Sequence, residues 1–112
     1  YLQLVCHTAA FDAGWWPAGS TENPLTFSSK IALVHSELSE ALEADRKSLM
    51  DDKLPHRPGR EVELADALIR IFDLAGAYGM DLAGALQEKL AYNSGRADHK
   101  PEARAETNGK KY

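Results

Sequence analysis

Four acidic residues stand in two pairs whose spacing could bring their carboxylates together. Glu37 and Glu40 are three residues apart, and so are Glu63 and Asp66. In an α-helix, residues three apart lie on one face, so each pair presents two carboxylates to the same neighbour. If the two helices lie side by side, four oxygen ligands converge, which suits a hard divalent cation, Mg²⁺ or Mn²⁺. The spacing therefore predicts a metal site, and catalytic residues, at these four positions.

Two alternatives to such a site follow from the same residues. A ferritin-like di-iron site requires Glu-x-x-His on two helices, and no glutamate of this chain is followed three residues later by histidine. Acidic pairs are also common on solvated helix faces. Both pairs, however, border apolar stripes on consecutive predicted helices. A carboxylate among apolar side chains is costly unless a cation neutralises it or it takes up a proton.

A second group of polar residues lies further along the chain. Lys89, Asn93 and Arg96 stand at i, i+4 and i+7, so they share one face of a predicted helix. Beside an acidic metal site, lysine and arginine would bind the phosphate oxygens that the metal leaves free, and the asparagine could bind a sugar or a phosphate. The alternative is that the two cations complement the negative end of the helix dipole. We predict a substrate-binding role for all three.

The loop from Gly14 to Pro24 holds two adjacent aromatic residues, Trp15 and Trp16. Their rings could stack on a nucleobase or anchor the loop to the core, and both interpretations remain open at this stage. Asp73 also has two candidate roles. It could hold a water near the metal, or it could form an ion pair with Arg70.

Helices must position these residues, because no stretch alternates with the two-residue period of a strand. The predicted helices run from about Leu2 to Ala13, from Ser28 or Ser29 to Asp51, from Arg60 to Tyr78, and from Asp81 to Arg96. Gly79 is expected to be left-handed after the third helix, and Asp81 to cap the fourth. The pattern predicts an all-α, four-helix-bundle-like fold with one domain over residues 1–100 and a tail or arm over residues 101–112.

The apolar residues of the two middle helices predict which faces are buried. In the second helix they are Ile31, Val34, Leu38, Ala41 and Leu42, and in the third they are Leu64, Leu68, Ile71, Ala75 and Tyr78. The third helix also carries Val62 and Ile69 on the other side of an acidic strip formed by Glu63, Asp66 and Asp73. One small core does not need that much apolar surface, so we predict a homo-oligomer.

Composition excludes several other classes of protein. The chain has 112 residues and a net charge of −4, which argues against broad nucleic-acid binding. Its one cysteine, Cys6, cannot form an internal disulfide, and this favours a reducing, cytoplasmic location. No apolar run approaches the roughly 18 residues of a membrane span, so no membrane partner is expected.

Together, the motifs resemble those of the MazG-like, all-α NTP pyrophosphohydrolase superfamily. Its signature is Glu-x-x-Glu, a spacer, Glu-x-x-Asp, and then Lys, Asn and Arg; here the segments read HSELSEALEADR, EVELADALIRIFDLA and EKLAYNSGRADHK. The resemblance covers roughly Ser28 to Lys100. It implies Mg²⁺-dependent cleavage of a nucleoside triphosphate between its α and β phosphates, giving a monophosphate and pyrophosphate. It also implies a homodimer or homotetramer, with a role in cleaning the nucleotide pool as one expectation.

The resemblance leaves the substrate open. Its relatives include dimeric dUTPases and dCTPases and the phosphoribosyl-ATP pyrophosphohydrolases. The segment from Gly14 to Phe27 matches nothing in the family pattern, so the base is not predicted. The alternative from a different class is a non-catalytic helical binding or assembly module. Presence of the complete acidic and basic signature favours an enzyme.

Overall fold

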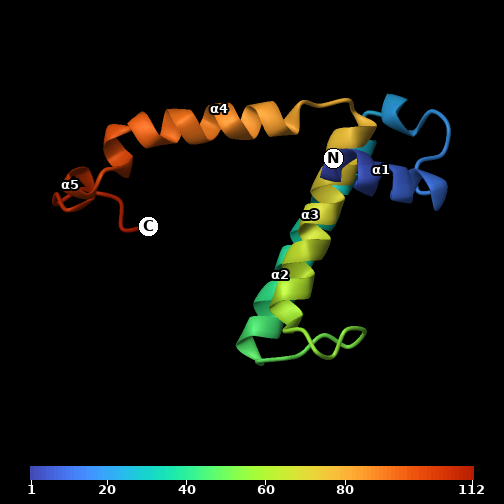
Figure 1. Ribbon diagram of the computed structural model, residues 1–112, viewed down its shortest axis with the longest axis horizontal. Helices are drawn as coiled ribbons and strands as arrows, with labels where there is room; N and C mark the ends of the chain where they lie inside the picture. Colours follow the sequence, from blue (N-terminus) through green and yellow to red (C-terminus); the bar gives the residue numbers. More distant parts are fainter. The chain divides into compact units, whose positions relative to one another are not determined.

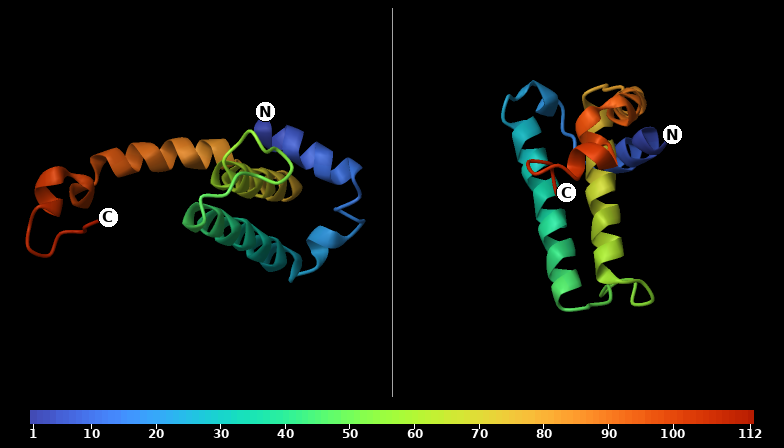
Figure 2. Two further views of the ribbon diagram at one scale, coloured as in Figure 1. Left: turned by 90° about the horizontal axis from the view of Figure 1, so that it is seen from below. Right: turned by 90° about the vertical axis from the view of Figure 1, so that its left-hand side faces the viewer.

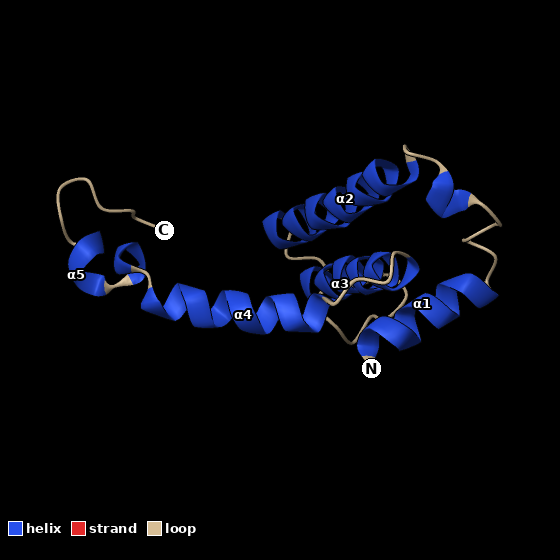
Figure 3. Cartoon of the chain, turned by 90° about the horizontal axis from the view of Figure 1, so that it is seen from above, coloured by secondary structure: helices blue, strands red, loops and turns tan.

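The computed structural model describes all 112 residues, and every regular element in it is a helix (Figure 3). The α-helices are α1 (Leu2–Asp12), α2 (Thr26–Arg46), α3 (Gly59–Ala77), α4 (Leu82–Gly95) and α5 (Pro101–Arg104), with short 3₁₀ turns at Ser20–Glu22 and Ala97–His99. This confirms the all-α prediction. The chain divides into two compact units, Tyr1–Met80 and Asp81–Tyr112, and each is described by itself. None of the helices is both long and apolar enough to cross a membrane.

In the first unit, α2 and α3 run antiparallel and side by side (Figures 1 and 2). Their buried residues are mostly small: Val34, Ala41 and Ala44 on α2, and Gly59, Ala67, Leu74 and Ala75 on α3. At Gly59 the helices come so close that a Cβ atom would lie 3.1 Å from the Cβ of Ala44. Small side chains therefore allow a tight helix pair with little apolar bulk between the backbones.

The predicted core faces of these helices were only partly right. Val34, Ala41 and Ala75 are buried, but Leu38, Leu42, Leu64 and Leu68 are 44%, 60%, 51% and 51% exposed. On α2, the row facing α3 is Val34, Glu37, Ala41 and Ala44, the four residues of this helix that are buried. The row of small residues packs against α3 in place of the leucine row, because small side chains let the two backbones approach. Glu37 belongs to this row and is therefore buried in the interface.

α1 packs against the last turns of α3. Gly76 makes this contact close, because a Cβ atom there would lie 2.5 Å from the Cβ of His7. Gln3 Nε2 donates a hydrogen bond of 2.7 Å to the carbonyl of Met80, just beyond the end of α3. The contact holds the N-terminal helix against the C-terminal half of α3.

Helix boundaries were predicted best where a glycine or a cap specifies them. Gly79 is left-handed, with φ 61°, and Asp81 caps α4 by accepting a hydrogen bond from the Gly84 amide at 3.0 Å, as predicted. The bounds of α2 were wrong at both ends. It begins at Thr26, and the Ser28 hydroxyl donates to the Leu25 carbonyl instead of capping the helix.

The early end of α2 at Arg46 has a visible cause. Ser48 adopts a left-handed conformation, with φ 52°, which a continuing helix does not allow. The buried Asp51 then accepts hydrogen bonds from the amides of Lys53 and Leu54, at 2.9 and 2.7 Å. This side chain organises the loop between α2 and α3, where the sequence pattern had predicted the last residue of a helix.

The second unit begins at Asp81 and contains α4, the 3₁₀ turn and α5. The segment after residue 100, predicted as a tail or arm, starts with the four-residue helix α5. Beyond it the chain folds back, since Lys110 Nζ lies 2.9 Å from a carboxylate oxygen of Asp98.

Candidate functional site

Three of the four predicted acidic ligands meet between α2 and α3. One carboxylate oxygen each from Glu37, Glu63 and Asp66 lies within 4.8 Å of the other two. Glu37 belongs to the row of α2 that faces α3, while Glu63 and Asp66 are three apart on α3 and so point the same way. Antiparallel packing of the two helices therefore brings residues of two sequence motifs together. We call Glu37, Glu63 and Asp66 the acidic cluster.

The acidic cluster is partly shielded from solvent, because Glu37 is buried while Glu63 and Asp66 are half-buried. Glu37 is only 8% exposed. Glu63 Oε2 is buried and has no hydrogen-bond partner. A buried oxygen without a donor is unfavourable, because it has lost its hydration and gained nothing in return. A proton or a cation at this point would remove the penalty.

The electrostatics of the cluster point in the same direction. Burial, followed by the neighbouring carboxylates of Glu37 and Glu40, raises the pKa of Glu63 to about 7. Burial and the charge of Glu37 likewise raise the pKa of Asp66. Both shifts mean that the negative form is disfavoured when the carboxylates have only one another as neighbours.

One cation of the chain contacts the cluster directly. Arg70 Nε donates a hydrogen bond of 2.7 Å to Glu37 Oε1. Burial works to raise the pKa of Glu37, but the hydrogen bond from Arg70 and the positive charge of Arg70 act against it, and the pKa lies below its ordinary value. The predicted alternative of an Arg70–Asp73 ion pair was therefore wrong, because Arg70 reaches across to α2 instead of along α3.

Glu40, the fourth predicted ligand, stands at the edge of the cluster. It is exposed and is not one of the three residues whose oxygens converge. Its carboxylate is nonetheless close enough to Glu63 to contribute to the raised pKa of that residue. The structure thus brings three of the predicted ligands together and leaves the fourth beside them with access to solvent.

The two tryptophans have different environments. Trp16 is 7% exposed, and its Nε1 donates a 2.7 Å hydrogen bond to Asp73 Oδ1, while Trp15 is 69% exposed. The same oxygen of Asp73 lies 2.9 Å from Nδ1 of His7. Lys30 Nζ lies 4.5 Å from the ring centre of Trp16. Trp16 therefore anchors its loop to α3, and Asp73 accepts the hydrogen bond that holds it there. Anchoring was one of the two roles that the sequence suggested for the tryptophans.

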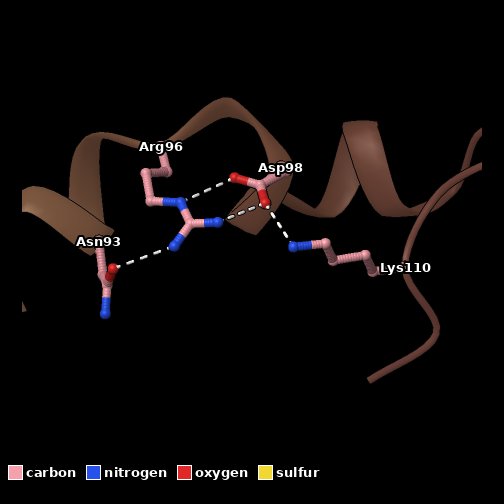
Figure 4. A network of polar contacts seen from close by, with 4 residues as sticks. All are labelled: Asn93, Arg96, Asp98 and Lys110. Carbon is pink, nitrogen blue, oxygen red and sulfur yellow. Dashed lines mark hydrogen bonds and ion pairs between the residues drawn. The ribbon is translucent and has the colours of Figure 1, made fainter.

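The predicted basic residues lie in the second unit, within and directly after α4. Arg96 follows the last residue of the helix, and its guanidinium contacts Asn93 Oδ1 at 3.4 Å and both oxygens of Asp98 at 3.0 and 2.7 Å (Figure 4). Lys89 Nζ and the Arg96 guanidinium carbon lie 4.8 and 5.8 Å from the ring centre of Tyr92. Lys89 and Asn93 lie four residues apart in α4, as predicted, whereas Arg96 lies just beyond the helix with an extended backbone and reaches Asn93 through its side chain.

Sequence reasoning missed three residues near these groups. Asp51 lies close enough to Asp66 to help raise its pKa. Lys110 contacts Asp98, as Figure 4 shows, and so approaches Arg96. Arg70 was considered only as an ion-pair partner of Asp73, so its contact with Glu37 was missed. For Arg70 a signal did exist, since it stands four residues after Asp66 and hence on the same face.

The arrangement could hold a hard cation through carboxylate oxygens, because it combines converging ligands with a buried oxygen that lacks a donor. It contains no histidine or cysteine that would favour a softer metal. In comparisons with known proteins, the chain matches no protein-family model, no curated protein and no solved structure.

Proposed function

We propose that this protein is a Mg²⁺-dependent nucleoside triphosphate pyrophosphohydrolase of the MazG-like kind, with Mn²⁺ as an alternative metal. The observation that carries the proposal is the buried, partnerless Oε2 of Glu63 inside the cluster with Glu37 and Asp66. An ordinary solvated acidic face has no such oxygen. The resemblance of three sequence motifs to that superfamily supplies the reaction class.

In the proposed reaction, the acidic cluster, Glu40 and the basic residues have different roles. Glu37, Glu63 and Asp66 would hold the cation, which when bound polarises the triphosphate and lowers the pKa of a nearby water. Glu40 keeps a solvent-accessible carboxylate beside the cluster, so it is suited to orient that water or accept its proton. The resemblance assigns phosphate binding to Lys89, Asn93 and Arg96, which belong to the second unit.

The direct test is a screen of canonical and modified nucleoside triphosphates with Mg²⁺, in which pyrophosphate and orthophosphate are measured separately. We expect pyrophosphate from the wild type and a severe loss of activity and of Mn²⁺ binding in Glu63→Gln. Glu61→Gln is the matched control, because Glu61 lies two residues away on α3 and pairs with Arg57 at the surface. Release of orthophosphate alone would disprove cleavage at the α phosphate.

The basic residues give a second arm of the same test. Lys89→Ala or Arg96→Ala should lower turnover by roughly 10- to 1,000-fold with helical content unchanged, since each removes one electrostatic stabiliser. Lys111→Ala, an exposed lysine of the same unit, is the control. If no NTP, dNTP or phosphoribosyl-ATP is hydrolysed, the protein is better explained as a non-catalytic binding module.

A further inference from the structure

Arg70 has one end fixed and the other end free. Its Nε donates to Glu37 Oε1 at 2.7 Å, and Glu37 is itself buried, so the guanidinium is held against the acidic cluster. Neither of its two terminal nitrogens has a hydrogen-bond partner in the chain, and 41% of the side chain is exposed. A charged fork of donors is thus presented to solvent beside a candidate metal site.

The Arg70–Glu37 pair differs from another ion pair between the same two helices. Arg60 and Asp45 show the ordinary case on the same two helices: the contact is 2.6 Å, and the partners are 66% and 55% exposed. In the Arg70 pair, by contrast, the side chain of the carboxylate partner Glu37 is only 11% exposed. The charge of Arg70 also acts on a second member of the cluster, because it opposes the rise in the pKa of Asp66.

We propose that Arg70 is a phosphate-binding residue, whose two terminal nitrogens bind oxygens of the metal-bound triphosphate while Glu37 holds the guanidinium in place. This rests on the proposed function and adds a residue that the acidic and basic motifs do not contain. Planar guanidinium donors match phosphate oxygens two at a time, and an anchored side chain loses little conformational freedom on binding. Arg70 would therefore complement the cation from within the first unit.

The experiment separates cation binding from phosphate binding and needs no knowledge of the base. The full-length protein is titrated first with Mn²⁺ and then, when loaded, with inorganic tripolyphosphate, by calorimetry. We expect Arg70→Ala to bind Mn²⁺ at least as tightly as the wild type, because a nearby positive charge is removed. Its affinity for tripolyphosphate should fall roughly 10- to 100-fold, as expected for loss of charged hydrogen bonds. Arg60→Ala is the matched control and should change neither affinity.

Each outcome decides a separate point. Binding of tripolyphosphate by Arg70→Ala within twofold of the wild type overturns the inference. Equal losses of Mn²⁺ and tripolyphosphate affinity also overturn it, since Arg70 would then only support the cluster. If the wild type itself binds neither probe, the proposed function has failed. Should Arg70→Ala not fold, Arg70→Lys serves instead: its ammonium can pair with Glu37 but has no planar fork, so weak tripolyphosphate binding is still expected.

Discussion

At the scale of single residues, the protonation state of Glu63 affects the stability of the protein. Its pKa is raised from 4.5 to about 7, with burial as the main cause and the neighbouring carboxylates next. The folded chain therefore keeps a proton that the unfolded chain has already released over that range. The stability that this group contributes is fully present below pH 4.5 and is lost as the pH rises toward 7, because the unfolded state then binds fewer protons than the folded state.

This predicts the pH dependence of unfolding. Urea midpoints measured without divalent cations should fall as the pH rises from 4.5 to 7. The free energy of unfolding should change with pH at a rate that approaches one released proton. The fall should be much weaker in Glu63→Gln. Asp66, whose pKa is also raised, contributes with the same sign. An identical pH dependence in wild type and Glu63→Gln would show that this carboxyl group titrates normally in the folded protein.

At the scale of elements, the docking of α1 on α3 depends on a missing side chain. A Cβ atom at Gly76 would lie 2.5 Å from the Cβ and 2.9 Å from the Cγ of His7, and 3.2 Å from the Gln3 carbonyl. These are backbone or near-backbone atoms, which cannot rotate away. Any larger residue at this position must therefore push α1 off α3 and disturb the contact between His7 and Asp73.

Gly76→Ala should destabilise the protein by about 1–3 kcal/mol, the usual cost of overpacking, even though alanine favours helix by about 1 kcal/mol. Thermal unfolding followed by tryptophan fluorescence measures it, because buried Trp16 donates to Asp73. The control is Gly95→Ala, where the added Cβ meets open space. Equal stability of Gly76→Ala and the wild type would contradict the close contact of these helices.

The elements also show how far sequence reasoning reaches. Four helices, the left-handed Gly79 and the cap at Asp81 follow from local chemistry, so they were predictable. The faces were harder, because a periodic pattern does not reveal that the small row through Ala41 and Ala44 packs more closely than the leucine row beside it. Within the candidate site, converging carboxylates followed from two short spacings. The contact of Trp16 with Asp73 spans 57 residues, and no local signal indicates such a pairing.

At the scale of the whole molecule, several leucines of α2 and α3 are exposed to solvent. Leu42, Leu64 and Leu68 are each at least half exposed on the single chain. Apolar area of this kind, on two adjacent helices, is typical of a surface that packs against a second copy. We predict a mass of at least two chains by light scattering at micromolar concentration.

The same surface offers a specific variant. Leu68→Glu should lower the measured mass toward the 12.3 kDa of one chain, while helical content stays the same, because the residue is 51% exposed before assembly. A wild type already at 12.3 kDa under these conditions would show that the exposed leucines do not drive assembly.

The packing of α1 on α3 also has a consequence in time. The residues that meet at His7 and Asp73 are 66 positions apart, and a ribosome adds roughly 5–20 residues per second. After α1 is synthesised, roughly 3–13 s therefore pass before the surface it packs against exists. Within that interval, α2 and the first turns of α3 can pair, since they follow one another along the chain. Of these three helices, α1 is made first and cannot pack in this way until α3 has been synthesised.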